Sequence, residues 1–150
     1  MKLTSLRLVV ASLLLAAGTS FAADLSPKAP DKLTPARTLI EQKKWTAAVD
    51  ELKKINDPAS ADWNNLMGYS LRKADAGNAA EAEKFYSEAL RIDPKHRGAL
   101  EYSGELYLMT GDLAKAEERL ATLDQVCRLP CEEYTDLKKK VAAYRRDHPN

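Results

Sequence analysis

Apolar residues recur with a helical period from Leu33 onwards. Ala, Leu, Glu and Lys dominate this part of the chain, β-branched residues are sparse, and no window alternates convincingly between apolar and polar positions. Apolar positions at i, i+4 and i+7 place their side chains on one face of an α-helix. The pattern therefore predicts an all-helical domain.

The helical pattern also repeats, with a period of about 34 residues, in the segments 44–55, 78–89 and 112–123. Three positions on one helix face recur in every segment. They are Ala48, Ala82 and Ala116; Leu52, Tyr86 and Leu120; and Ile55, Ala89 and Leu123. A period of this length built from helix pairs is typical of stacked helix hairpins.

Small and aromatic residues in these units resemble the signature of the tetratricopeptide repeat (TPR) family. In the third unit the matching residues are Gly104, Tyr107, Gly111, Ala116 and Leu120. In the second they are Gly68, Leu71, Gly77, Ala82, Tyr86, Ala89 and Pro94, if the first helix is two residues longer and the preceding turn two residues shorter. The resemblance covers residues 33–126 and implies a right-handed superhelix of about three hairpins, at 33–60, 61–94 and 95–126. The first unit is degenerate, as is common for a terminal repeat.

The signature residues have physical roles in such hairpins. Gly104 and Ala116 lack bulk, so the two helices of a pair approach closely. Asn78 and Asp112 follow glycines in the turns and are expected to cap the second helix of each pair. Pro94 ends its helix, because the residue before a proline resists helical angles.

A further helix is expected after the repeats, within a segment at 127–150. Tyr134, Leu137, Val141 and Tyr144 form one apolar stripe, which would cover the exposed face of the last hairpin. Glu132 and Glu133 lie at its start, where negative charges interact favourably with the helix dipole. The lysine run at 138–140 is interpreted as a solvated outer face.

In TPR proteins the first helices of the pairs line a concave groove. Carried over by resemblance, the groove positions here are Asn65, Tyr69, Arg72, Glu101, Tyr102, Glu105, Leu108 and Met109. Glu101 and Glu105 would repel a terminal carboxylate, so a carboxylate clamp is disfavoured. An acidic and aromatic groove suits a peptide that carries Lys or Arg.

The first 22 residues have the layout of a secretory signal peptide. Lys2 and Arg7 precede a short apolar run. The small residues Ser20 and Ala22, with one residue between them, then mark the expected cleavage site after Ala22. Residues 23–32 contain two prolines and no apolar period, and we expect a disordered leader. This pattern predicts a periplasmic or secreted protein with no membrane attachment after cleavage.

Cys127 and Cys131 are the two cysteines of the chain. In an exported protein such a pair usually becomes a disulfide, here one that would fix the last helix. The alternative is a thiol pair that binds copper or cycles between redox states. Neither His96 nor His148 is near enough in sequence to complete a metal site, and no cofactor is expected.

Composition argues against several other functions. The formal net charge is +1, with acids and bases interspersed, which does not suit nucleic-acid binding. No phosphate-binding loop, zinc-protease motif or nucleophile–base grouping is present. The sequence therefore predicts a non-catalytic scaffold or assembly factor that binds a protein or peptide in the concave groove.

Overall fold

The computed structural model describes residues 31–129 and 131–149. The expected signal peptide at 1–22, and all but the last two residues of the expected leader at 23–32, lie outside the described residues.

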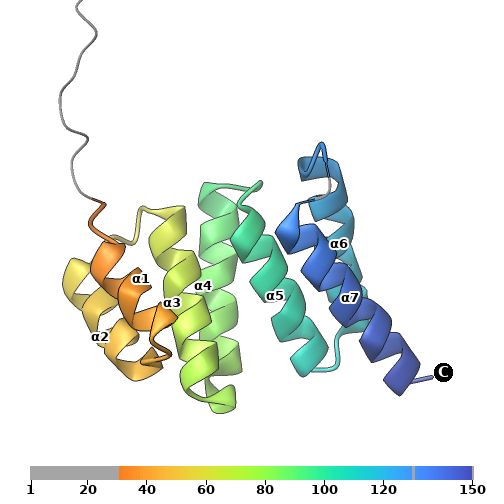
Figure 1. The fold of residues 1–150 in the computed structure, drawn as a ribbon, viewed down its shortest axis with the longest axis horizontal. Helices are drawn as coiled ribbons and strands as arrows, with labels where there is room; N and C mark the ends of the chain where they lie inside the picture. Colours follow the sequence, from red (N-terminus) through yellow and green to blue (C-terminus); the bar gives the residue numbers. More distant parts are fainter. Residues whose placement is uncertain (1–30, 130, 150) are drawn as a thin grey trace, which may run out of the picture.

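Seven α-helices and one short 3-10 turn make up the described part of the chain, which contains no strand (Figure 1). None of these helices is long and apolar enough to cross a membrane. The predicted all-α fold is confirmed. The helices are α1 (Thr34–Glu41), α2 (Trp45–Ile55), α3 (Ala61–Ala74), α4 (Ala79–Ile92), α5 (Arg97–Met109), α6 (Leu113–Val126) and α7 (Glu132–Asp147), with the 3-10 turn η1 (Ala76–Asn78) before α4.

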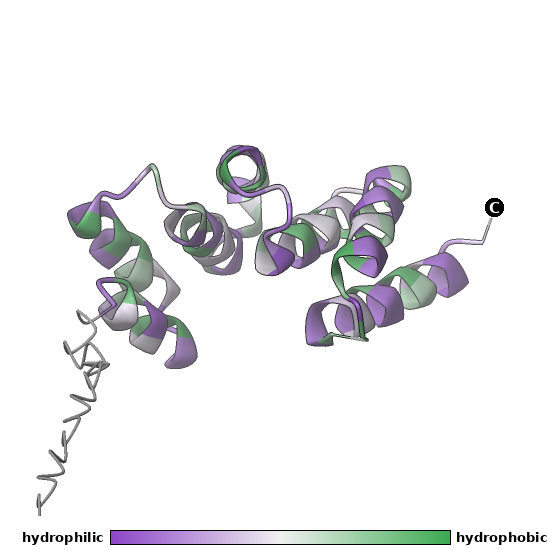
Figure 2. Cartoon of the chain, turned by 90° about the horizontal axis from the view of Figure 1, so that it is seen from above, coloured by the Kyte–Doolittle hydropathy of each residue, from purple (hydrophilic) through white to green (hydrophobic). Residues whose placement is uncertain are grey.

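The helices pack as successive hairpins along a curved stack. The pairs are α1 with α2, α3 with α4, and α5 with α6, and α7 then packs against α5 and α6. Seen from above, α1, α3, α5 and α7 lie on the inner side of the arc, and α2, α4 and α6 lie on the outer side (Figure 2). The inner helices therefore form a concave face.

Small residues at equivalent positions allow the two helices of each hairpin to approach. Ala48, Ala82 and Ala116 are each fully buried. Gly68 lies against the ring of Tyr86, because a Cβ atom added at Gly68 would be 2.9 Å from Tyr86 Cε1. Protein interiors are packed without spare volume, so a methyl group at Gly68 would push the ring or the helix aside.

The turns between paired helices differ from one another. Asp112 caps α6 as expected, with its side chain accepting a hydrogen bond from the Lys115 amide at 3.1 Å. The expected cap at Asn78 is wrong: this side chain makes no capping bond and instead donates to the carbonyl of Leu71 at 3.2 Å. The capping bond is made three residues earlier, where the Asp75 carboxylate accepts a hydrogen bond from the Gly77 amide and caps the 3-10 turn η1.

α7 closes the stack through its apolar stripe. Leu137 and Val141 are buried in a cluster with the core residues of the third hairpin. Gly104 makes this contact possible, since a Cβ atom there would be 2.6 Å from Leu137 Cδ2 but 3.3 Å from Cβ of Arg119 in the paired helix α6. The absence of a side chain at Gly104 therefore allows α7 to pack closely against α5, and it matters less for the packing of α6.

Polar contacts join the starts of the inner helices. The Asp62 carboxylate accepts a 2.9 Å hydrogen bond from Arg37 of α1 and lies 2.9 Å from Nε2 of His96. Nδ1 of His96 accepts from the Ala99 amide at 3.1 Å and so caps α5. Asp62 and His96 therefore connect all three hairpins at one edge of the stack.

Candidate functional site

Aromatic rings from the three hairpins form a continuous row, in which Tyr69 and Tyr102 belong to inner helices. The ring centroids of Tyr69 in α3 and Tyr102 in α5 are 4.5 Å apart. Trp45, at the start of α2, makes an edge contact with Tyr69 at 5.8 Å. This row links the first hairpin to the third and provides apolar area that is open to a ligand.

A pocket of about 370 Å³ opens beside this row, between α3, α5 and the beginning of α7. Acidic side chains dominate it, and we call it the acidic pocket. It is lined by Tyr69, Lys73, Glu101, Tyr102, Glu105, Glu132, Glu133, Asp136 and Lys140. Five of these nine residues are carboxylic acids and two are lysines.

Glu101 is the most unusual member of the acidic pocket. The residue is only 8% exposed, yet its carboxylate makes no hydrogen bond or ion pair with any residue in the described part of the chain. Burial raises the pKa of Glu101 to about 7; nearby Lys140 acts in the opposite direction, and Asp136, Glu133 and Glu132 add to the rise. A buried acid without a partner is costly to ionise, so this site favours the arrival of a positive charge.

A chain of charges crosses the concave face next to the acidic pocket. Arg72 of α3 donates to the Glu105 carboxylate at 2.7 Å, and both side chains are almost fully buried. Lys140 of α7 pairs with the other oxygen of Glu105. The Arg72 guanidinium also lies 5.7 Å from the centre of the Tyr69 ring. These contacts hold three inner helices together and fix the shape of the face.

A second pocket, of about 400 Å³, lies on the other side of this charge chain. We call it the apolar pocket, because Leu108, Met109, Ala143 and Tyr144 provide much of its surface. Its full lining is Arg72, Glu105, Leu108, Met109, Lys140, Ala143, Tyr144, Asp147 and His148. Met109 is 50% exposed, one of two large apolar side chains in the described part that are open to solvent.

The structure brings together most of the groove residues expected from sequence. Tyr69, Glu101 and Tyr102 line the acidic pocket, Met109 lines the apolar pocket, and Glu105 lines both. Arg72 lines the apolar pocket alone. Asn65 lines neither pocket: it is buried, and its amide nitrogen lies 3.0 Å from where a side chain at Gly98 would begin.

Sequence reasoning missed the contribution of α7 to this face. Glu132, Asp136 and Lys140 all line the acidic pocket, although the sequence indicated only a covering helix and a solvated lysine run. Lys140 is exposed to solvent, as that interpretation expects, but it lies on the concave face, where it pairs with Glu105. Their spacing of four residues places the three on one helix face, and this was the available signal.

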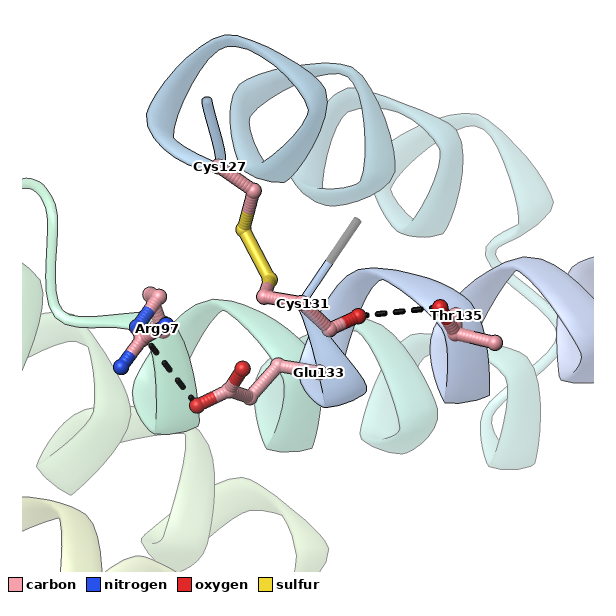
Figure 3. The surroundings of a disulfide bond; sticks show 5 residues. All are labelled: Arg97, Cys127, Cys131, Glu133 and Thr135. Carbon is pink, nitrogen blue, oxygen red and sulfur yellow. Dashed lines mark hydrogen bonds and ion pairs between the residues drawn. A yellow bond between two sulfur atoms is a disulfide. The ribbon is translucent and has the colours of Figure 1, made fainter. Parts of the chain in front are cut away.

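Cys127 and Cys131 face each other across the bend between α6 and α7, where a disulfide joins them (Figure 3). Their Cα atoms are 5.8 Å apart. In the part of the chain that the structure describes, no group of three His, Cys, Asp or Glu side chains is arranged to hold a metal ion. The pair lies directly before Glu132, so it anchors the end of α7 that contributes acids to the pocket.

Comparison with known proteins identifies the repeat architecture. The family model described as tetratricopeptide repeat matches residues 73–141, and the helix hairpins agree with it. This match confirms the resemblance to tetratricopeptide-repeat proteins over those residues. Among its TPR signature residues, Ala82 and Ala116 are fully buried and Gly68 packs against Tyr86. No curated protein sequence matches this chain.

Several solved TPR-like structures share the fold. The type III secretion translocator chaperone SycD of Yersinia enterocolitica has a TM-score of 0.67 at 19% identity, covering 77% of this chain and 82% of that one. SycD in complex with a peptide of the translocator YopD has a TM-score of 0.62 at 19% identity, covering 77% of this chain and 88% of that one. PcrH in complex with the chaperone binding region of PopD has a TM-score of 0.65 at 16% identity, covering 77% of this chain and 90% of that one.

These neighbours overturn one expectation. The chain was expected to be periplasmic or secreted, but the similar structures are type III secretion chaperones, and this finding contradicts that expectation. The copper or redox alternative for Cys127 and Cys131 gains no support from any of these relatives.

Proposed function

We propose that this TPR protein holds a segment of a partner protein on its concave face and works as a non-catalytic scaffold or assembly factor. The single observation that carries this proposal is the pair of adjoining pockets on the inner side of the arc. They are built from α3, α5 and α7 and are flanked by the row of Trp45, Tyr69 and Tyr102. Rigid helices present these side chains, so the face is formed before a ligand arrives.

Two further observations support a protein or peptide as the ligand. The partly exposed aromatic rings and the exposed Met109 on this face provide adaptable contact area of the kind found at protein interfaces. Two of the solved structures with this fold are complexes with a segment of another protein, a peptide of YopD and a chaperone binding region of PopD. We extend from them only the class of ligand, a peptide segment, to this chain.

The proposed organisation follows the hairpins. We keep the units at 33–60, 61–94 and 95–126 as the repeats, and the segment at 127–150 as the cap. The cap has a second role in this proposal, because α7 forms one wall of both pockets.

Site-specific crosslinking tests this function. A photoreactive phenylalanine analogue is placed at Tyr69 on the concave face, and in a matched control at Ser87, which is exposed on the outer helix α4. We expect light-dependent adducts with defined protein segments from position 69 and few from position 87, in cells that make the protein. Equal yields from both positions, or none from position 69, would refute the concave face as the binding site.

A further inference from the structure

We propose that the concave face recognises a two-part motif, in which a lysine or arginine side chain enters the acidic pocket and an apolar side chain of the same segment enters the apolar pocket. This inference rests on the proposed function and adds the chemistry of the bound segment. The two pockets adjoin each other through Glu105 and Lys140, which line both. One short segment can therefore reach both.

The charge of the acidic pocket is incompletely balanced by its own residues. Glu105 is paired with Arg72 and Lys140, Glu133 lies 3.6 Å from Arg97, and Asp136 lies 3.2 Å from Lys139. Glu101 and Glu132 have no ion pair with any residue described. Two carboxylates are thus available to a cation from outside.

The two lysines that line the acidic pocket are engaged elsewhere. Lys140 binds Glu105, and the ammonium group of Lys73 lies 5.6 Å from the centre of the Trp45 ring. Neither forms an ion pair with Glu101. A buried carboxylate in this position gains most from a ligand charge, because water solvates it poorly.

The walls of the acidic pocket suit a long cationic side chain better than a bare metal ion. Tyr69 and Tyr102 lie beside the carboxylates and offer their rings to the hydrocarbon stem and the charge of Lys or Arg. The described carboxylates do not group into a metal-binding set. A peptide side chain therefore fits the shape and the charge together.

The apolar pocket supplies the second part of the motif. Half-exposed Met109 and the neighbouring Leu108 and Tyr144 leave apolar surface open beside the charge chain. Burying such surface against a Leu, Ile, Met or Phe side chain releases water and stabilises the complex. The buried Arg72–Glu105 pair between the pockets separates the two kinds of environment.

A displayed library of random 12-residue peptides, selected on the whole purified protein, tests the motif. We expect the enriched peptides to share a Lys or Arg and an apolar residue at a fixed spacing. Replacing that Lys by norleucine in a synthetic copy should weaken binding by at least about tenfold, measured by fluorescence anisotropy. Replacing the apolar residue by Ser should weaken binding as well.

Variants of the protein separate the motif from general effects. Glu101→Gln and Glu132→Gln should each reduce the difference in binding affinity between the lysine peptide and the norleucine peptide. Glu118→Gln, on the exposed side of the outer helix α6, is the matched control and should leave it unchanged. Glu132 is exposed, so its variant reports on binding even if Glu101→Gln were to disturb folding.

The outcomes distinguish the motif from the function on which it rests. Peptides that bind the concave face with no preference for Lys or Arg would overturn the two-part motif and leave the scaffold function standing. Enrichment of no peptide, together with an absence of crosslinks from position 69, would overturn both.

Discussion

Leu137 of α7 fills the space that Gly104 of α5 leaves empty, and a Cβ atom at Gly104 would lie 2.6 Å from Leu137 Cδ2. Gly104→Ala therefore forces α7 outward. We expect a loss of about 1–3 kcal/mol in the free energy of unfolding, measured by urea denaturation. Gly77→Ala is the control, because its nearest neighbour would be at 3.4 Å. Equal stabilities of the two variants would contradict close packing of α7 against α5.

The Arg72–Glu105 pair predicts an asymmetric response to mutation. Glu105→Leu leaves the buried Arg72 guanidinium without its carboxylate, and we expect a loss of about 3 kcal/mol in urea denaturation. Arg72→Met should cost less, because Glu105 retains Lys140. The reverse order would show that Lys140 contributes little. Since Glu105 is structural, charge reversal at Glu132 probes the binding face more cleanly than charge reversal at Glu105.

Glu101 predicts a dependence of stability on pH. Its pKa is raised from an ordinary 4.5 to about 7 by burial, so between these values the folded protein keeps a proton that the unfolded chain releases. Its contribution to stability is complete below pH 4.5 and is lost as the pH rises towards 7. Relative to Glu101→Gln, the wild type should lose roughly 2–3 kcal/mol between pH 4.5 and 8.

Chemical denaturation of the two proteins in parallel at several pH values checks this. Lys140 and the acids Glu132, Glu133 and Asp136 face Glu101 from α7, and they are present in both proteins. Their own titration therefore largely cancels in the difference. A difference in stability that stays constant with pH would contradict a raised pKa at Glu101.

The Cys127–Cys131 bond predicts a stability that responds to reduction. The closed loop is short, and its chain entropy corresponds to about 2 kcal/mol. A dithiol reductant should lower the unfolding free energy of the wild type to that of the Cys127→Ser/Cys131→Ser variant, which should itself be insensitive to the reductant. A wild type that is equally stable with and without the reductant would show that the bond contributes nothing.

The fold was predictable because its information is local and periodic. Ala48, Ala82 and Ala116 could be aligned by spacing alone, and each is fully buried where its hairpin closes. The end of α4 at Ile92 likewise follows from Pro94 two residues later.

The binding face was predictable only in part. Tyr69 and Glu101 could be placed by analogy between repeats, whereas Lys140 belongs to a helix outside the repeat pattern. Its position depends on how α7 lies across α5, which is set by the contact of Leu137 with Gly104. The bond between Asp62 and His96 also joins separate hairpins, and periodicity within one helix carries no information about it.

α7 packs on the third hairpin and also forms a wall of both pockets, and this limits where the array can be lengthened during evolution. A repeat inserted before α7 would move Glu132 and Lys140 one hairpin away from Glu101 and Glu105, and the pockets would come apart. A hairpin added ahead of α1 would leave the two pockets as they are. The place at which a repeat is added therefore decides whether the present binding face survives.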